Sequence, residues 1–380
     1  MTETIPLFRT FTDEKDVEAV AKVLRRGTYW AAGPEIEAFE RKIAAFVGRK
    51  YALAFNSGTS ALHTVLLTHD IKGKEVIVPS FTFVATVNAV LLAGGIPVFA
   101  ESEPETFGLD VVDVEKRITP RTSMIIDLHY GGIPARDTEK IHRLAKAKGI
   151  VHVSDAAESL GAMISGKQVT RFCDSAIYSF CQNKVVATGE GGMLVTDNET
   201  VYEKAKLLRS HGRVELAEDY FSSTKDNDYI EVGYNYRMPS MIAALGLSQF
   251  DKLQDVVKCR RVRAQKISTA IGNLDGIRIP QELPGHFAVY QMYTIQLPDM
   301  VTRDALQEYL KERGIMSKVY FNPVHLKTMY RQRFGCKEGD LPMTEALSGR
   351  VLNIPLFPTM SDDEISRLTG AICNFMEVKR

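Results

Sequence analysis

The stretch that decides the fold is Tyr178-Ser179-Phe180-Cys181-Gln182-Asn183-Lys184, followed by Ala187-Thr188-Gly189-Glu190-Gly191-Gly192. It places a lysine between a short apolar strand and a glycine-rich turn. Upstream, Val151-His152-Val153-Ser154-Asp155 is predicted to be a buried strand that ends in an aspartate. A loop lysine can form a Schiff base with an aldehyde, and a strand-end carboxylate can keep a pyridine nitrogen protonated. This order predicts pyridoxal 5′-phosphate (PLP) chemistry, with Lys184 and Asp155 as catalytic residues.

Each of these residues also has a structural interpretation. A single lysine is more often a surface residue, and Asp155 could cap the segment Ala156-Ala157-Glu158. Buried aspartates are rare without a partner, so this position requires a cation or a hydrogen-bond donor. Ser179 and Asn183 could hold a phosphate or simply form a turn. The combination and order of the residues favour a cofactor site.

Two further segments suit a flat, phosphorylated cofactor. Asn56-Ser57-Gly58-Thr59-Ser60-Ala61-Leu62-His63 runs from a predicted strand, Tyr51 to Phe55, into a helix. Small residues at a helix N-terminus present free backbone N–H groups and the positive end of the helix dipole, which favour a phosphate, although an ordinary N-cap has the same composition. Phe83 follows Pro79-Ser80-Phe81-Thr82 and could stack on a cofactor ring or be a core residue.

Composition limits the class of protein. The chain has 380 residues, of which 45% are hydrophobic and 25% charged, which is typical of a globular protein with a large core. Lys+Arg and Asp+Glu are equal at 47 each and no charge run stands out, so neither a nucleic acid nor a membrane is expected as a partner. The longest apolar stretch, around residues 84–96, is too short and too interrupted to span a bilayer.

The cysteines and the N-terminus favour a cytoplasmic protein. Residues 1–6 have neither the basic start nor the apolar core of a signal peptide. The cysteines are odd in number and lack a CxxC pattern, which indicates a reducing compartment, no disulfide framework and no metal site. They are Cys173, Cys181, Cys259, Cys336 and Cys373.

One segment nearly matches a nucleotide-binding motif. Gly161-Ala162-Met163-Ile164-Ser165-Gly166-Lys167-Gln168 fits the P-loop pattern except at Gln168, where the magnesium-binding hydroxyl is missing. We interpret it as a tight turn and expect no nucleotide hydrolysis. The chain also lacks GxGxxG, so a nicotinamide-dependent alternative loses its main support.

Helix and strand signals alternate from about residue 34 to residue 197, which predicts an α/β fold with a largely parallel sheet covered on both faces. Ligands of such sheets bind beyond the carboxyl ends of the strands, where Asp155 lies.

A long charged helix over Asp251 to Leu274 is predicted to bridge to a smaller C-terminal α+β domain. Glu215 to Asp228 is predicted to be a loop and a candidate lid. Besides those named above, the predicted strands are 75–79, 97–100, 123–126 and 289–297, and the predicted helices are 35–47, 83–93, 111–118, 138–148, 303–313 and 362–376.

Together these motifs resemble the DegT/DnrJ/EryC1/StrS family, the sugar aminotransferases of PLP fold type I. The resemblance covers nearly the whole chain. It is carried by Ser57-Gly58-Thr59-Ser60-Ala61-Leu62, Pro79 to Phe83, Asp155-Ala156-Ala157-Glu158-Ser159-Leu160-Gly161, Ser179 to Gly192, and Gly233-Tyr234-Asn235-Tyr236-Arg237-Met238. It implies a large domain, residues 1–250, with a mixed, mostly parallel seven-stranded sheet between helices. A small C-terminal α+β domain, residues 251–380, would include the bridging helix, and the N-terminal segment could pack on it.

The resemblance also implies a role for individual residues. Lys184 would bind PLP covalently, Asp155 would pair with the pyridine nitrogen, and Phe83 would stack on the ring. The remaining roles concern the phosphate, the phenolic oxygen of the cofactor and the substrate. Gly58, Thr59 and Ser179 would hold the phosphate, Glu158 would lie near the phenolic oxygen, Asn235 would reach the phosphate of the neighbouring subunit in a homodimer with shared active sites, and His325 and Arg237 would contact the substrate.

The implied reaction moves an amino group from L-glutamate, which leaves as 2-oxoglutarate, to a nucleotide-linked keto sugar through pyridoxamine 5′-phosphate. Glu158, the Gly-Glu-Gly-Gly block and the Asn-Tyr-Arg-Met block resemble members that aminate C4 of 4-keto-6-deoxy hexoses more than those that act at C3. C3 amination, a free keto-cyclitol substrate and a non-catalytic regulator with a PLP-type fold stay open as alternatives. Sugar identity, the nucleotide base and the pathway are not specified by the sequence.

Overall fold

A seven-stranded sheet forms the centre of the molecule, with the strand order β1-β9-β8-β5-β4-β2-β3. The structure, a computed structural model, describes residues 4–214 and 228–378, so the predicted loop Glu215 to Asp228 lies outside the described residues except for Asp228. All pairings are parallel except those of β9, which runs antiparallel to β1 and β8, so the predicted mixed, mostly parallel sheet is confirmed. The strands are Tyr51–Phe55 (β1), Glu75–Pro79 (β2), Ile96–Ala100 (β3), Thr122–Leu128 (β4), Val151–Asp155 (β5), Ser175–Ser179 (β8) and Gly192–Thr196 (β9).

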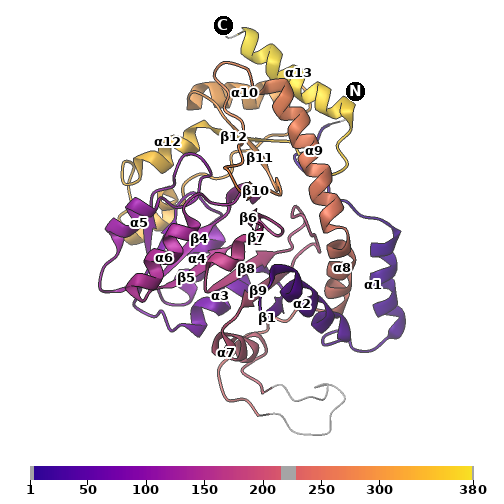
Figure 1. The fold of residues 1–380 in the computed structure, drawn as a ribbon, viewed down its shortest axis with the longest axis vertical. Helices are drawn as coiled ribbons and strands as arrows, with labels where there is room; N and C mark the ends of the chain where they lie inside the picture. The colour runs from indigo at the N-terminus through magenta and orange to yellow at the C-terminus, as the bar shows by residue number, and fades with distance from the viewer. Residues whose placement is uncertain (1–3, 215–227, 379–380) are drawn as a thin grey trace.

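Helices cover both faces of this sheet (Figure 1). Alternate strand residues point to opposite faces, so each strand supplies two cores. One core lies under α3, α4 and α7, and the other face packs against α2, α8, α5 and α6. The helices are Glu14–Arg26 (α1), Pro34–Val47 (α2), Gly58–Thr68 (α3), Val84–Leu92 (α4), Val111–Arg117 (α5), Thr138–Lys148 (α6), Glu199–Arg209 (α7), Ser240–Asp251 (α8), Leu253–Ile271 (α9), Met300–Glu312 (α10), Thr328–Phe334 (α11), Pro342–Arg350 (α12) and Asp362–Val378 (α13), with short 3-10 turns at Tyr130–Gly132 (η1), Val169–Phe172 (η2) and Val324–Leu326 (η3).

A separate hydrophobic core, distinct from the two on the faces of the sheet, belongs to the C-terminal part of the chain. Strands β11 (Tyr293–Gln296) and β12 (Val351–Ile354) pair antiparallel, and α9, α10 and α13 pack around them. Ile5 is buried in the same core and forms a bridge with Ile315, so the N-terminal segment packs against it. Residues 324–341, in contrast, contribute Val324, Tyr330 and Leu341 to the core of the seven-stranded sheet.

Three local predictions differ from the structure or are refined by it. The predicted helix over residues 251–274 is confirmed as α9, which is slightly shorter, because it begins at Leu253 and ends at Ile271. The predicted strand 289–297 is ordered as a strand only over β11. The P-loop-like segment is a tight hairpin turn between β6 (Met163–Ile164) and β7 (Lys167–Gln168), with β10 (His286–Phe287) paired to β6, so our interpretation as a turn is confirmed.

The register of the sheet brings three chain segments together at one end of the strands, where β1 and β8 end and β9 begins. Gly192, the first residue of β9, lies opposite both Phe55 at the end of β1 and Ser179 at the end of β8. A Cβ on Gly192 would meet the Ser57 carbonyl oxygen at 2.3 Å, a contact that only glycine avoids. The segments that leave β1 and β8 are therefore in direct contact. Among the described residues, no helix is long and apolar enough to cross a membrane.

Burial of His129, the residue after β4, predicts a stability loss in mild acid. Burial lowers the pKa of His129 to about 4, against the partial opposing effect of Asp127. Between pH 6.5 and pH 4 the unfolded chain takes up a proton that the folded chain does not, so stability falls as the pH falls. At pH 5 this single group should cost about 2 kcal/mol relative to pH 7.5.

The measurement compares urea unfolding of the wild type and His129→Asn at both pH values. Asparagine keeps an acceptor near the position of Nδ1, which accepts the Ala135 N–H at 3.0 Å, but does not titrate. The wild type should lose about 2 kcal/mol more than the variant between pH 7.5 and pH 5. An equal loss in both proteins would show that His129 is not the titrating group.

Candidate active site

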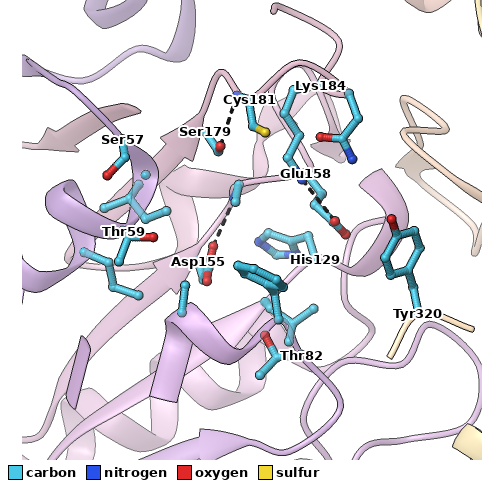
Figure 2. A pocket seen from close by; sticks show the side chains of 18 of the residues that line it. Ser57, Thr59, Thr82, His129, Asp155, Glu158, Ser179, Cys181, Lys184 and Tyr320 are labelled. Carbon is cyan, nitrogen blue, oxygen red and sulfur yellow. Dashed lines mark hydrogen bonds and ion pairs between the residues drawn. The ribbon is translucent and has the colours of Figure 1, made fainter. Parts of the chain in front are cut away.

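A cavity of about 320 Å³ opens at the carboxyl ends of β4, β5 and β8, beside the N-terminus of α3. Polar side chains from these separate elements point into it (Figure 2). Seven of the predicted site residues line it, namely Gly58, Thr59, Phe83, Asp155, Glu158, Ser179 and Lys184. The other lining residues are Ser57, Leu62, Thr82, Ala85, Leu128, His129, Ala157, Ile177, Cys181, Asn183, Glu190, Met292, Tyr320 and Phe321.

Asp155 ends β5 at the floor of the cavity, with part of its surface open to the cavity. Its Oδ2 accepts a hydrogen bond from Thr86 Oγ1 at 2.8 Å, and its Oδ1 accepts the Ala157 N–H at 3.2 Å. Burial raises the pKa of Asp155, and these hydrogen bonds and the Lys184 charge oppose that increase. Both close donors are neutral, so this carboxylate has no cation at ion-pair distance within the described residues. It suits a protonated ring nitrogen.

A pair of threonines, which the sequence analysis missed, supports this carboxylate. Thr86 donates its only hydroxyl proton to Asp155, so the hydrogen bond between Thr82 Oγ1 and Thr86 Oγ1, 2.8 Å long, must take its proton from Thr82. The chain of donors therefore has one direction, from Thr82 through Thr86 to Asp155. Thr86 lies in the first turn of α4, three residues after Phe83, and this helical spacing is the signal that could have identified it.

The side chains of Lys184 and Glu158 point toward each other and are in contact in the cavity (Figure 2). Lys184 Nζ lies 3.1 Å from Glu158 Oε1, and both side chains are mostly buried. The second carboxylate oxygen of Glu158 accepts the Gly131 N–H at 2.9 Å, which fixes the orientation of the carboxylate. The lysine is carried by the β8–β9 loop, which is closed by hydrogen bonds from Phe180 N to Gly191 O and from Thr188 N to Phe180 O. The amine is thus held over the cavity by a well-ordered loop.

The N-terminus of α3 forms an anion cradle. Ser57 caps the helix by accepting the Ser60 N–H at 3.0 Å, and its carbonyl accepts the Ala61 N–H. The preceding amides, those of Gly58 and Thr59, have no acceptor within the helix. A Cβ on Gly58 would lie 3.0 Å from the Ser179 Cβ, so a side chain here would push the two segments apart by a few tenths of an ångström. Free amides, the helix dipole and the Ser179 hydroxyl together suit a phosphate.

Aromatic side chains form the mouth of the cavity. Phe83 is 61% exposed, which is unusual for a core residue and consistent with a ring that covers a ligand. Phe321, from the C-terminal part of the chain, lies opposite with its ring centroid 6.2 Å from that of Phe83. Tyr320 is next to it. The sequence analysis missed both residues, because nothing in the sequence links residue 321 to residue 83.

Three predicted site residues lie outside the cavity lining. Asn235 is exposed on the surface, where its backbone oxygen accepts a hydrogen bond from Asn56 Nδ2 at 3.3 Å. Arg237 donates to Ser210 Oγ at 3.2 Å. His325 is only 1% exposed and contacts Ser80 and Glu345. Their assigned contacts to a neighbouring phosphate and to a substrate stay predictions.

His129 is a further lining residue that the sequence analysis did not name. It follows β4 directly, and residues after the carboxyl ends of parallel strands belong to the ligand edge of a sheet. Its Nδ1 accepts the Ala135 N–H and its Nε2 lies 3.2 Å from Ser154 Oγ. The same strand-end rule that indicated Asp155 would have indicated His129.

The residues present fit PLP. Asp155 is a carboxylate that has no cation at ion-pair distance among the described residues, the α3 cradle suits a phosphate, and a loop lysine lines the same cavity. The fold and this site define a PLP-dependent enzyme of fold type I, in which the cofactor supplies an electron sink for the carbon that loses or gains the amino group.

Comparison with known proteins identifies the family. The model of the DegT/DnrJ/EryC1/StrS aminotransferase family matches residues 11–373, and the chain belongs to this family. It is 33% identical to GDP-perosamine synthase of Escherichia coli O157:H7 over 376 residues, 99% of each chain. Among solved structures, it resembles PseC of Helicobacter pylori, an aminotransferase involved in the biosynthesis of pseudoaminic acid, with a TM-score of 0.92 and 27% identity over 99% of this chain and 100% of that one.

A second similar structure was determined with a sugar nucleotide present. DesI, determined in the presence of its TDP-sugar product, is similar with a TM-score of 0.89 and 27% identity over 100% of this chain and 95% of that one. The protein is thus a PLP-dependent sugar aminotransferase, and the predicted family, enzyme class and cofactor are confirmed. The alternative of a non-catalytic regulator is not supported.

Lys184 is expected to bind the cofactor covalently, because it is the lysine that the structure places in the cavity. Borohydride reduction of the purified holoenzyme, followed by peptide mapping, should find the pyridoxyl group on Lys184. Lys184→Arg should abolish the label, whereas Lys167→Arg, in the exposed β6–β7 turn, should retain it. A label that survives Lys184→Arg would contradict the assignment.

Proposed function

We propose that this enzyme transfers the amino group of L-glutamate to C4 of a nucleotide-linked 4-keto-6-deoxy hexose, and that it works as a homodimer with shared active sites. The observation that carries the proposal is the arrangement of Lys184 opposite Asp155, with the α3 phosphate cradle at one end of a cavity that is open at the other. Such a cavity can accept a small amino acid and then a larger sugar in turn.

The chain's own residues account for the proton transfers that both half-reactions need. The amine of Lys184 would move a proton between the substrate carbon that bears the nitrogen and the cofactor carbon that is bonded to the same nitrogen, for which the amine must be neutral. Glu158, 3.1 Å from Lys184 Nζ, would hold the lysine ammonium in place after the amine has taken up a proton. Asp155, held by Thr86, keeps the positive charge of the ring nitrogen at the floor of the site.

The preference for C4 rests on the resemblance of three parts of the sequence. These are Glu158 and the blocks Gly189-Glu190-Gly191-Gly192 and Asn235-Tyr236-Arg237-Met238. Glu158 and Glu190 both line the cavity, so differences at these positions can affect how a sugar lies above the lysine. The nucleotide-linked form of the substrate is supported by the relatives named GDP-perosamine synthase and DesI with its TDP-sugar product.

A dimer with shared sites is supported by the position of Asn235. Its backbone lies beside Asn56, next to the phosphate cradle, and the residue is exposed to the outside of the chain. Nearby Tyr229, Ile230 and Val232 are also more than half exposed. An exposed apolar surface of this kind next to a ligand site favours contact with a second subunit.

The reaction is tested with L-glutamate and a panel of nucleotide-linked 3-keto and 4-keto 6-deoxy hexoses, together with a free keto-cyclitol. We expect stoichiometric 2-oxoglutarate and a 4-amino sugar nucleotide, with the carbon that bears nitrogen identified by NMR. Lys184→Ala should lower turnover by at least about 10³-fold, because a general acid–base group contributes roughly 10²–10⁴-fold. Nitrogen at C3, or turnover of the free cyclitol alone, would refute the substrate assignment.

Shared sites are tested by subunit mixing. Lys184→Ala and Asn235→Ala homodimers should each be strongly impaired, and a mixture that exchanges subunits should recover up to about a quarter of wild-type activity. If the lysine and the asparagine of one site come from different subunits, half of the mixed molecules are hybrids and each hybrid has one intact site. Native mass spectrometry verifies the exchange, and hybrids without activity would argue for sites within one subunit.

A further inference from the structure

The motif Asn322-Pro323-Val324-His325 follows directly after the two aromatic residues of the cavity mouth, yet His325 does not line the cavity. His325 is 1% exposed and Ser80 is 0% exposed. A buried histidine with polar partners from distant parts of the chain has a fixed orientation, because each lost hydrogen bond would leave an unsatisfied group.

Three hydrogen bonds join His325 and its neighbour Val324 to Ser80, the residue after β2. His325 Nδ1 lies 2.6 Å from Ser80 Oγ, the His325 N–H donates to the same oxygen at 3.1 Å, and the Val324 N–H donates to the Ser80 carbonyl at 2.9 Å. On the far side of the ring, His325 Nε2 lies 3.1 Å from Glu345 Oε1.

The partners of Glu345 assign the protons of this group. Burial acts to raise the pKa of Glu345, but the Gly339 and Leu341 N–H groups and His325 lower it overall. An ionised carboxylate only accepts, so Nε2 of His325 carries the proton that it donates. In the neutral ring Nδ1 is then an acceptor and takes the Ser80 hydroxyl proton. Every polar group in the cluster of Ser80, His325 and Glu345 is satisfied in this one arrangement.

The hydrogen bonds of the cluster of Ser80, His325 and Glu345 connect the two chain segments that form opposite walls of the cavity. Ser80 lies shortly before Thr82 and Phe83, which line one wall, and His325 lies shortly after Tyr320 and Phe321, which line the opposite wall. The Tyr320–Phe321 segment is also held from behind, since the Tyr130 hydroxyl donates to the Tyr320 carbonyl and Ser348 Oγ donates to the Phe321 carbonyl at 2.9 Å. The distance between Phe83 and Phe321 therefore depends on the contact between His325 and Ser80.

We propose that His325 is a positioning residue, which through Ser80 and Glu345 sets the width of the mouth between Phe83 and Phe321 and so determines how well the keto-sugar substrate binds. The inference rests on the proposed function, in which a hexose must pass and lie against these two rings. L-Glutamate is smaller and reaches Lys184 without filling the mouth. Loss of the cluster should weaken the sugar half-reaction and leave the glutamate half-reaction nearly unchanged.

The test uses two complementary substitutions in the holoenzyme. In His325→Asn the amide reaches the position of Nδ1, next to Ser80, and in His325→Gln it reaches the position of Nε2, next to Glu345. Ser80→Ala removes the same contact from the other side. Tyr330→Phe is the matched control, because it removes a 2.6 Å hydrogen bond between the same C-terminal segment and Asn88 of α4 without touching the cavity.

We expect His325→Gln and Ser80→Ala to raise KM for the nucleotide keto sugar by about tenfold, the effect of one hydrogen bond, with kcat within about threefold of wild type. Single-turnover conversion of the cofactor by glutamate, followed by absorbance, should stay within about twofold. His325→Asn should retain most of the sugar affinity. Equal loss in both half-reactions, no change in KM, or the same change in Tyr330→Phe would each overturn the proposal.

A failure of the proposed function is distinguishable from a failure of this inference. If the wild type converts its cofactor with glutamate but turns over no nucleotide-linked sugar, the proposed function fails. Hydrogen exchange of residues 318–326 in the full-length holoenzyme then decides the positioning role. Faster exchange in His325→Gln and Ser80→Ala than in Tyr330→Phe supports it, and equal exchange in all three variants refutes it.

Discussion

The structure depends on one electrostatic constraint, which is that Asp155 must carry its charge inside the protein. A carboxylate enclosed at the end of a central strand is costly unless donors and a cation surround it. The chain supplies donors from α4 and from the turn after β5, but the cation is left to the ligand. Each neighbouring element follows from this. The α3 N-terminus would hold the anionic end of the same ligand, and the β8–β9 loop places Lys184 in the same cavity.

The antiparallel strand β9 makes this arrangement possible. The parallel strands place their last residues at one end of the sheet. A parallel strand in the position of β9 would need a long crossover after β8. Because β9 returns directly from that end, the lysine loop stays beside the sheet, and Gly192 lies against the segment that starts the phosphate cradle. The residues predicted to bind the cofactor thus follow neighbouring strands of the sheet. The mouth of the cavity is formed where the C-terminal segment contacts the residues after β2.

The difference between these two regions explains what could be predicted from the sequence. Lys184, Asp155 and the α3 cradle are recognisable because each is marked by its own local pattern, a strand end or a helix start, and the fold brings strand ends together by rule. Thr86 and His129 carried usable local signals that were overlooked. Helix α1 also had one, since Asp13 caps it with a capping box and Gly27 ends it with φ of 73°.

No local sequence pattern could predict that Tyr320 and Phe321 line the mouth of the cavity. Phe321 lies beside Phe83 only because segments distant in sequence pack together, and the direction of the His325 side chain is set by Ser80 and Glu345. The helix predicted over residues 251–274, in contrast, is confirmed as α9, because its charged, periodic sequence is itself a local pattern. Its exact start is set by tertiary contacts, since Lys252, where α8 and α9 meet, bonds to Asp16 and Asp13 of the N-terminal segment.

The bridge between Ile5 and Ile315 has a consequence for biosynthesis. An isolated extended segment gains little from its own backbone, so Ile5 reaches its buried position only after the ribosome has made the core that covers it. At roughly 5–20 residues per second, that interval is on the order of 15–60 s. The segment around Ile5 is therefore made long before the C-terminal core that it helps to close.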